Sequence, residues 1–417
     1  MVRLVIFIMC LLSTTSAFAD TAGVEDSVPQ KLNLNGSVRA GYFSSSRKLD
    51  GQENLGTASV WLKLSPDIGS NASLMVEGWV RNDESLTGNS KVMLREGYLN
   101  YSAGDADFRI GKQIIAWGRA DRLNPTDNLT PYNYTLLTSE NDDQRLGTAA
   151  VKMTYHFHDT SLTGIWIPSF TPNVFPLAAP PGTYFTEQSP RSNQVALKLD
   201  RSGGAVDWSV SYFSGLDLNP DFGIGATGSS GTNLILKHNR IRVLGMDAAT
   251  VVGRYGLRAE AAYSWTSNTG PNDSLVKKSF IYVVAGGDRT IFNNLNINVQ
   301  YYFHHVTDYQ DPHTIANSLL RTLAIQAAIL SQQLDRFEHG VSIRVSNNWL
   351  NETLKGEIAG LYSLTHGDYV LKPKLVYAFN DQLTGTLGLD IYRGGADTFY
   401  GQLRGISSIF VEMKSSF

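Results

Sequence analysis

Residues 105–147 read DADFRIGKQIIAWGRADRLNPTDNLTPYNYTLLTSENDDQRLG, and the interpretation of the whole chain depends on this stretch. A strand-like segment, Phe108–Ile115, ends at Trp117-Gly118-Arg119 and is followed by about thirty residues rich in charged groups, Asn and Thr, with two prolines. Loops in compact domains usually have about 4–6 residues. So long a connection indicates a functional loop, whose role depends on the strands around it.

The N-terminus has the features of a secretory signal peptide. Arg3 precedes an apolar run over residues 4–12, and Ala17-Phe18-Ala19 supplies small residues two apart before a cleavage site. We predict cleavage after Ala19, which makes residues 1–19 a signal peptide and residues 20–417 a single domain. The only cysteine, Cys10, lies in the removed segment, so we expect neither a disulfide nor a thiolate metal site.

Composition narrows the possible classes. The formal net charge is −3, which does not favour a nucleic-acid binder. Beyond the signal peptide, the sequence has no run of about 18–20 apolar residues that would form a membrane-spanning helix. An exported chain with 19 Tyr, 18 Phe and 7 Trp is therefore a soluble secreted or periplasmic protein, or an outer-membrane barrel.

A two-residue period decides between these classes. It is clearest where Leu295, Ile297, Val299, Tyr301 and Phe303 alternate with polar residues. About 18 such segments occur, many ending in an aromatic residue, which a soluble β-sandwich explains poorly and the two interfaces of a bilayer explain well. The pattern predicts an all-β fold, a transmembrane antiparallel β-barrel of about 18 strands, with 16 as the alternative.

The lengths of the connections predict the orientation of the barrel. Short turns follow the even-numbered strands, and most connections after odd-numbered strands are long; we assign the short turns to the periplasm and the long loops to the exterior. The long loops are residues 116–145, 168–192, 215–238 and 304–337. Within the last, residues 315–334 have helical spacing, which predicts a helix packed on the rim or lying in the lumen.

Extending the alternation places a set of polar and aromatic residues on the lumen face. Basic residues outnumber acidic ones on this face, which favours anions, unless the charges simply pair across strands. Trp61 and Trp79 would either stack on solutes or fill space beneath a folded loop. The lumen-lining residues predicted are Arg39, Lys63, Trp61, Glu77, Trp79, Arg81, Arg109, Arg240, Arg242, Arg258, Glu260, Lys372 and Lys374.

The loop 116–145 is predicted to fold inward and constrict the channel, with an external cap as the alternative. Its candidate constriction residues are Trp117, Arg119, Asp121, Arg122, Asn124 and Asp127. Barrels of 16–18 strands leave an aqueous channel, and about eleven residues before the first strand are too few for a plug domain. We expect no cofactor and no metal, because His156, His158, His304 and His305 lack further ligands at metal spacing.

Three short segments resemble a known group of proteins. Leu94-Arg95-Glu96-Gly97-Tyr98, Arg109-Ile110-Gly111-Lys112-Gln113 and Trp117-Gly118-Arg119 with Asn124-Pro125 are similar to porin-like proteobacterial outer-membrane barrels, including alginate-export-type barrels and their relatives. The resemblance implies an outer-membrane channel or exporter. In some relatives it implies association with inner-membrane exporters, which makes trafficking of lipids or hydrophobic compounds an alternative function.

The predicted function is channel-type transport of small, anionic or amphipathic organic solutes across the bacterial outer membrane. A barrel-type hydrolase is a third reading, but no nucleophile is spaced with a base, so we expect no enzyme. Expected partners are outer-membrane lipid and lipopolysaccharide, the solute, and either a second copy of the chain or an inner-membrane exporter. We expect no nucleic-acid partner. Phe417, Met413 and Val411 resemble the signal read by the barrel-assembly machinery, although Ser415 stands where an aromatic residue is usual.

Overall fold

In a computed structural model, the strands with alternating polar and apolar residues close into a barrel. The structure describes residues 32–417 except 50–51, 84–90, 178, 189, 191 and 267–272. The predicted signal peptide, residues 1–19, lies outside the described residues. Among the described residues, no helix is both long and apolar enough to cross a membrane.

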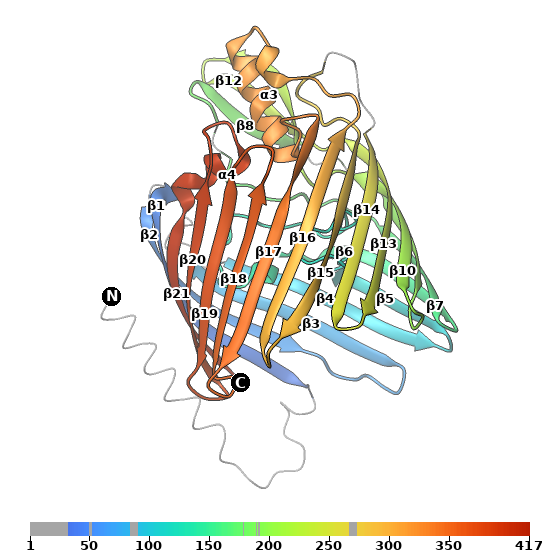
Figure 1. The fold of residues 1–417 in the computed structure, drawn as a ribbon. Coiled ribbons are helices and arrows are strands. Elements are labelled where there is room, and N and C mark those ends of the chain that lie inside the picture. Colours follow the sequence, from blue (N-terminus) through green and yellow to red (C-terminus); the bar gives the residue numbers. More distant parts are fainter. Residues whose placement is uncertain are drawn as a thin grey trace.

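Eighteen antiparallel strands form one closed sheet, which confirms the predicted fold (Figure 1). Each strand pairs with its neighbours, and β1 closes the ring on β21 through pairs such as Ser37 with Ser416. In chain order the strands are β1 (Leu34–Leu49), β2 (Gln52–Leu64), β3 (Ala72–Asp83), β4 (Lys91–Ala103), β5 (Ala106–Gln113), β6 (Thr148–Phe157), β7 (Thr160–Ile167), β9 (Gln194–Arg201), β10 (Asp207–Leu216), β13 (Arg240–Val252), β14 (Tyr255–Thr266), β15 (Phe280–Ile291), β16 (Leu295–Val306), β17 (Phe337–Trp349), β18 (Leu354–Ser363), β19 (Tyr369–Ala378), β20 (Leu383–Arg393) and β21 (Ser408–Ser416).

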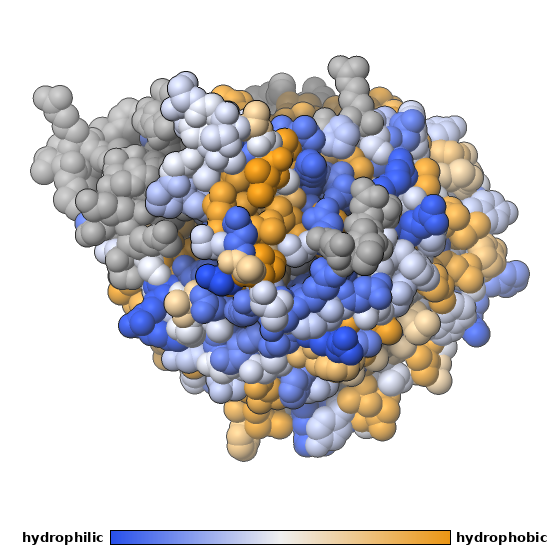
Figure 2. Space-filling model, turned by 90° about the horizontal axis from the view of Figure 1, so that it is seen from above, coloured by the Kyte–Doolittle hydropathy of each residue, from blue (hydrophilic) through white to orange (hydrophobic). Residues whose placement is uncertain are grey.

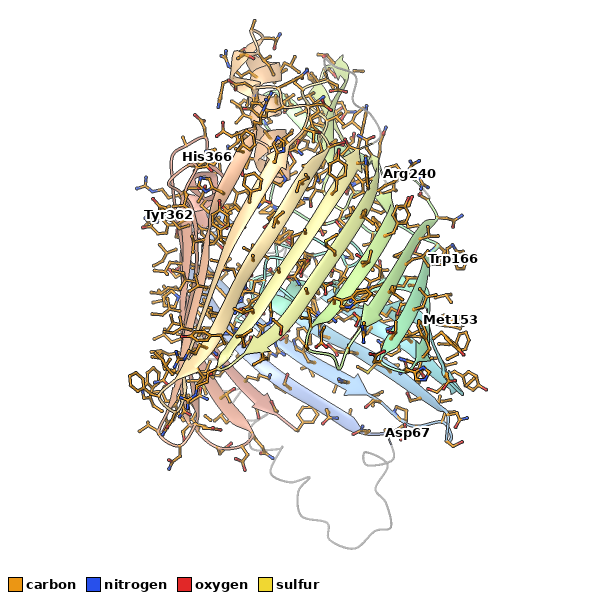
Figure 3. The ribbon with its side chains drawn as sticks, turned by 45° about the vertical axis from the view of Figure 1, so that its right-hand side comes forward. Asp67, Met153, Trp166, Arg240, Tyr362 and His366 are labelled. Atoms are coloured by element: carbon orange, nitrogen blue, oxygen red, sulfur yellow. The ribbon has the colours of Figure 1, made fainter. Side chains whose placement is uncertain are left out.

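The two faces of the wall differ as the alternation predicts. On β16, Val299 and Tyr301 point outward and are 44% and 46% exposed, whereas Asn298 and Gln300 point inward and are buried. Met153, Trp166 and Tyr362 likewise project from the outer surface (Figure 3). Apolar side chains therefore form the surface that faces lipid, and polar ones face the interior.

The two rims differ in the same way. Tight turns join β4 to β5 at Gly104 and β13 to β14 at Gly253, both with φ near +60°, a backbone conformation that favours glycine. Both ends of the barrel sequence lie on this rim, where the Gly36 N–H donates to the Phe417 carbonyl oxygen at 2.9 Å. The rim of short turns is the periplasmic one, and the long loops are extracellular.

The regular pairing of strands in the wall is interrupted at two positions. The pairing of β3 with β4 shifts register between Glu77 and Gly78, so Arg95 is an additional residue opposite them and forms a β-bulge. Pro373 stays inside β19, and the β19–β20 pairing is interrupted at residues 372–373, because proline cannot donate to the ladder.

A small extracellular layer covers part of the barrel mouth. The loops 168–192 and 215–238 were predicted without strands, but they contribute β8 (Thr183–Gln188), β11 (Asp221–Gly228) and β12 (Gly231–Lys237), with β12 pairing parallel to β8. The predicted helix is α3 (Ser318–Ser331), shorter than residues 315–334. It packs on this sheet through Leu323, Phe222 and Leu234, so it lies on the rim and not in the lumen (Figure 1).

Short helices complete the extracellular side and the inner loop. They are η2 (Asn141–Gln144), η3 (Pro312–Thr314), α4 (Phe399–Gln402) and η4 (Leu403–Ile406).

Candidate functional site: the loop inside the barrel

The connection between β5 and β6 crosses the interior of the barrel. It leaves at Gln113, returns at Thr148, and meets inward-facing side chains of strands far apart on the wall. Arg119 pairs with Asp200 of β9 and Asp247 of β13, whereas Asp143 pairs with Arg39 of β1 at 2.6 Å. Contacts on opposite parts of the ring are possible only for a loop inside the lumen, so the inward fold is confirmed and the external cap is wrong.

Glu260 of β14 is the anchor of the first half of the loop. Its carboxylate accepts the backbone N–H groups of Arg119 at 3.1 Å, Ala120 at 3.2 Å and Thr126 at 2.8 Å, and the Thr126 hydroxyl at 2.8 Å. Glu260 is 1% exposed. These donors satisfy a buried charge that would otherwise be costly.

Gly118 makes this anchor possible. Its φ is +97°, and a Cβ atom at this position would lie 2.4 Å from Oε2 of Glu260. A side chain here would displace the carboxylate or the loop. The Trp117-Gly118-Arg119 motif therefore combines an apolar anchor, a close approach of the backbone, and a cation that bridges two acids.

One side of the loop packs on an apolar part of the inner wall. Trp117 and Leu129 of the loop lie against side chains of β6, β7, β9, β10, β13 and β14, all buried. The cluster comprises Ile115, Trp117, Leu129, Ala150, Ile165, Ile167, Ala196, Phe213, Ile241, Val243 and Ala262. Here the inner wall meets protein and not water, so it is apolar.

This packing corrects the prediction for β13. Ile241 and Val243 point inward into the apolar cluster, so Arg240 and Arg242 alternate with them on the outer surface and are exposed. They do not line the lumen. Arg240 projects at the upper edge of the barrel and donates to the Ser192 hydroxyl at 2.9 Å (Figure 3).

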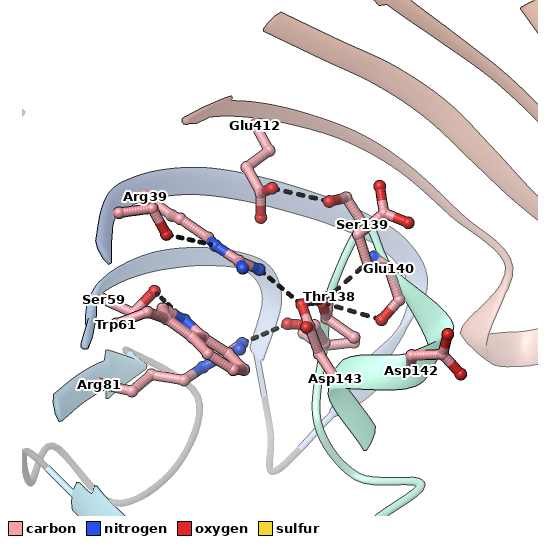
Figure 4. A network of polar contacts seen from close by, with 12 residues as sticks. Arg39, Ser59, Trp61, Arg81, Thr138, Ser139, Glu140, Asp142, Asp143 and Glu412 are labelled. Carbon is pink, nitrogen blue, oxygen red and sulfur yellow. Dashed lines mark hydrogen bonds and ion pairs between the residues drawn. The ribbon is translucent and has the colours of Figure 1, made fainter. Parts of the chain in front are cut away.

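The second half of the loop is held by a polar network (Figure 4). The Thr138 hydroxyl donates to Asp143 at 2.8 Å, and the Ser139 hydroxyl donates to Glu412 of β21 at 2.7 Å. Lys374 of β19 pairs with Glu140 at 3.3 Å. The guanidinium group of Arg81 donates to the Leu137 carbonyl oxygen. Polar contacts with the wall therefore hold this half, together with the apolar packing of Leu136 and Leu137.

Trp61 and Trp79 lie beneath the loop. Their ring centroids are 5.9 Å apart, Leu136 packs on both, and they are 7% and 4% exposed. The Arg39 guanidinium covers Trp61 at 4.3 Å. These rings fill space under the loop and leave almost no face for a solute. This arrangement supports the prediction that they fill space beneath a folded loop, and not the alternative that they stack on solutes.

The wall from β14 to β20 carries charge pairs that stay partly accessible. Arg122 of the loop, with 39% of its side chain exposed, pairs with Glu357 at 2.6 Å, and Asp121 pairs with Arg344 at 2.7 Å. Farther along are Arg258 with Asp288 at 2.7 Å and Lys372 with Asp390 at 3.3 Å. This side of the lumen presents both signs of charge to any solute that passes.

The structure shows acidic residues on the inner wall that the sequence analysis missed. They are Asp200, Asp247, Asp288 and Glu412. Asp247 was missed because Ile241 and Val243 were assigned to the outer face of β13. Asp200 and Asp288 were missed because the alternation predicts strands only over residues 195–199 and 280–284, whereas β9 and β15 continue to Arg201 and Ile291. Glu412 lies between Val411 and Met413, so alternation alone would have found it. The inner wall is consequently less basic than predicted.

The remaining predicted residues have structural contacts. Glu77 pairs with Arg95 at 2.5 Å, and Arg109 donates to Asn100 at 2.8 Å. Asp127 pairs with Arg145 inside the loop at 2.8 Å, and Asn124 donates to the Trp117 carbonyl oxygen at 3.2 Å. Lys63 lies on the inner face of β2 near the periplasmic rim and is exposed. None of these joins a nucleophile to a base.

A closed 18-stranded barrel with short turns on one rim and a loop folded inside has the architecture of outer-membrane channel proteins. Comparison with solved structures shows the same fold in other proteins. OccK5 (OpdH) of Pseudomonas aeruginosa has a similar fold, with a TM-score of 0.56 and 10% sequence identity over 92% of this chain and 97% of that chain. OpdK of the same organism, solved with vanillate, matches with a TM-score of 0.55 and 9% identity over 92% of this chain and 97% of that chain. OccAB3 of Acinetobacter baumannii matches with a TM-score of 0.56 and 8% identity over 92% of this chain and 98% of that chain.

The chain belongs to the family described as "Protein of unknown function (DUF1302)", which matches residues 12–417. No curated protein matches it. The closed barrel with its apolar outer face indicates the outer membrane, and these comparisons show a porin-like barrel fold. The narrower resemblance to alginate-export-type barrels stays a prediction.

Proposed function

We propose that this protein is a constricted outer-membrane channel for small amphipathic organic solutes, including organic anions. The observation that carries the proposal is the loop of residues 114–147, which crosses the lumen, packs on the apolar wall on one side and forms partly accessible charge pairs with β17 and β18 through Asp121 and Arg122. Arg122 can exchange Glu357, and Arg344 can exchange Asp121, for the carboxylate of a solute, because partly solvated ion pairs are only weakly stabilised. Such exchange gives a passing anion successive binding partners.

Reversing the charge of Arg122 tests the role of this side. For Arg122→Glu we expect the chloride-to-potassium permeability ratio to fall by roughly twofold, because a cation in the confined lumen becomes an anion. The ratio is obtained from reversal potentials in planar bilayers under a KCl gradient. Arg201→Glu is the matched control, since Arg201 pairs with Asp159 near the periplasmic rim, on the outer face of β9. Equal ratios in the wild type and both variants would contradict the proposal.

A second function, transfer of hydrophobic compounds, is favoured by one observation. Hydrophobic residues gather near the centre of the extracellular face, bordered by hydrophilic ones (Figure 2). Such a patch beside the mouth could receive an apolar molecule. Purified protein in planar bilayers distinguishes the two: steady ionic conductance supports the channel, whereas a barrel that stays closed to ions supports transfer of apolar compounds.

The outward arginines suggest how lipopolysaccharide, the predicted lipid partner, would bind. Arg242 lies beside the exposed ring of Trp265 on the outer surface, and Arg240 lies one pleat closer to the loops. Guanidinium groups at this level can bind the phosphates of lipid A, and the indole ring suits the interface. We expect the double variant Arg240→Ser/Arg242→Ser to retain about half the co-purifying lipopolysaccharide or less. Unchanged retention, equal to that of Lys63→Ser, would contradict this binding mode.

A further inference from the structure

Three aromatic rings form an offset stack where two loops meet at the extracellular mouth. Tyr132 and Tyr134 belong to the inner loop, and their ring centroids lie 5.6 Å apart at an interplanar angle of 13°. Phe175, from the loop after β7, continues the stack at 5.0 Å and 20° from Tyr134. At these separations the rings are displaced from one another and overlap only in part.

The backbone fixes the positions of these rings. Asn133 and Val174 form a parallel bridge, in which the Tyr134 N–H donates to the Val174 carbonyl oxygen at 2.9 Å and the Val174 N–H donates to that of Tyr132 at 2.8 Å. The Tyr132 N–H donates to the Asn173 side chain at 2.7 Å. Two loops joined in this way hold a preorganised surface, which lowers the entropic cost of binding.

The stack is also tied to the outer rim. The Asn173 N–H donates to the Leu218 carbonyl oxygen at 3.0 Å, and its side-chain amide donates to Asn219 at 2.6 Å. Both partners lie within three residues of the extracellular end of β10. The rings therefore lie near the mouth, before the constriction formed by the rest of the inner loop.

The stack is accessible, unlike the two tryptophans beneath the loop. Tyr134 is 44% exposed and the adjacent Val174 is 40% exposed. Surrounding protein nevertheless raises the pKa of Tyr134 to about 12, so its hydroxyl stays protonated and can donate. Part of the Tyr134 ring is therefore open to solvent where the two loops meet.

The charge next to the stack is largely neutralised. The Arg145 guanidinium covers Tyr132 at 4.7 Å and pairs with Asp127 at 2.8 Å. Arg145 therefore strengthens the stack through a cation–π contact but attracts anions only weakly. Recognition at this surface depends on ring shape and hydroxyl donors more than on net charge.

We propose that Tyr132, Tyr134 and Phe175 form a binding subsite for planar aromatic solutes that carry an oxygen acceptor, such as aromatic carboxylates. A flat ring extends the offset stack, and a tyrosine hydroxyl donates to the acceptor. A saturated ring of similar size lacks the planar π face that this geometry accommodates. The inference rests on the proposed channel function for its physiological role, but binding to the subsite is measurable without transport.

Benzoate and cyclohexanecarboxylate are the matched probes, because they share size and charge and differ in planarity. With the full chain purified in detergent, we expect titration calorimetry to show benzoate binding about fivefold more tightly than cyclohexanecarboxylate. Tyr134→Leu should abolish that difference, and Tyr134→Phe should retain part of it. Tyr184→Leu is the control, since Tyr184 is an exposed tyrosine on β8, outside the stack. Equal binding of the two acids, or a preference that survives in Tyr134→Leu, overturns the subsite.

Uptake into liposomes separates this inference from the proposed function. Preferential benzoate binding without uptake of either acid would reject the channel and leave the subsite standing. Uptake of both acids without preferential binding would reject the subsite and leave the channel standing.

Discussion

Replacing residues 114–147 with a short Gly-Ser turn is expected to raise the single-channel conductance by roughly threefold or more. Gln113 and Thr148 are direct pairing partners, so a tight hairpin can join β5 to β6 without changing the register of the wall. The variant removes the protein that fills the side of the lumen beside β6–β14. Conductance increases because a barrel of this size encloses an aqueous channel when nothing fills it.

The measurement is the current through single barrels in planar bilayers, together with the largest sugar that enters liposomes. Correct assembly is checked by resistance of the barrel to unfolding in detergent at room temperature. An assembled variant with wild-type conductance would show that the constriction lies elsewhere. If the loop-deletion variant does not assemble, Gly118→Leu tests the same prediction with a single substitution. It should displace the loop because a side chain at this position meets the Glu260 carboxylate.

The barrel could be predicted from sequence because neighbouring residues in the chain determine both the two faces of each strand and the turn that follows it. A strand such as Leu295–Val306 carries its two faces in adjacent residues, and a turn such as Gly253-Arg254 follows directly from its strands. Lipid on the outside imposes the same requirement on every strand. Alternation and connection length were therefore sufficient for strand number and orientation, whereas the choice between an inward loop and an external cap needed the contacts of the loop with the wall.

The inner surface was harder to predict, because its surroundings vary. Where water fills the lumen, inward residues are polar; where the loop packs, as at Ile241 and Val243, they are apolar and the alternation inverts. The outer layer depends on a parallel pairing of β8 with β12 across some fifty residues of sequence. The aromatic stack joins Tyr134 to Phe175 from different loops. Contacts of this kind leave no periodic signal in a single sequence.

Glu260→Ala is expected to release the first half of the inner loop, which gives the second large effect. The substitution leaves the backbone N–H groups of Arg119, Ala120 and Thr126 without their acceptor in a buried site. Each unsatisfied buried donor costs about 1–3 kcal/mol, so docking of the loop should weaken by at least about 2 kcal/mol. Gln would keep the size of the side chain but lose the charge-assisted bonds, and Glu260→Gln should be intermediate.

The expected readouts are large current fluctuations and new protease cleavage between residues 116 and 131. Glu357→Ala is the matched control, because its carboxylate contacts the loop through the partly exposed side chain of Arg122 and such pairs contribute about 0–1 kcal/mol. We expect the Glu357→Ala variant to show no large current fluctuations and to stay resistant to protease. If Glu260→Ala behaved like Glu357→Ala, the apolar cluster around Trp117 and Leu129 would be sufficient to hold the loop, and the constriction would be a fixed part of the barrel wall. A noisy, cleavable Glu260→Ala channel would instead show that one carboxylate controls whether the lumen is narrow or open.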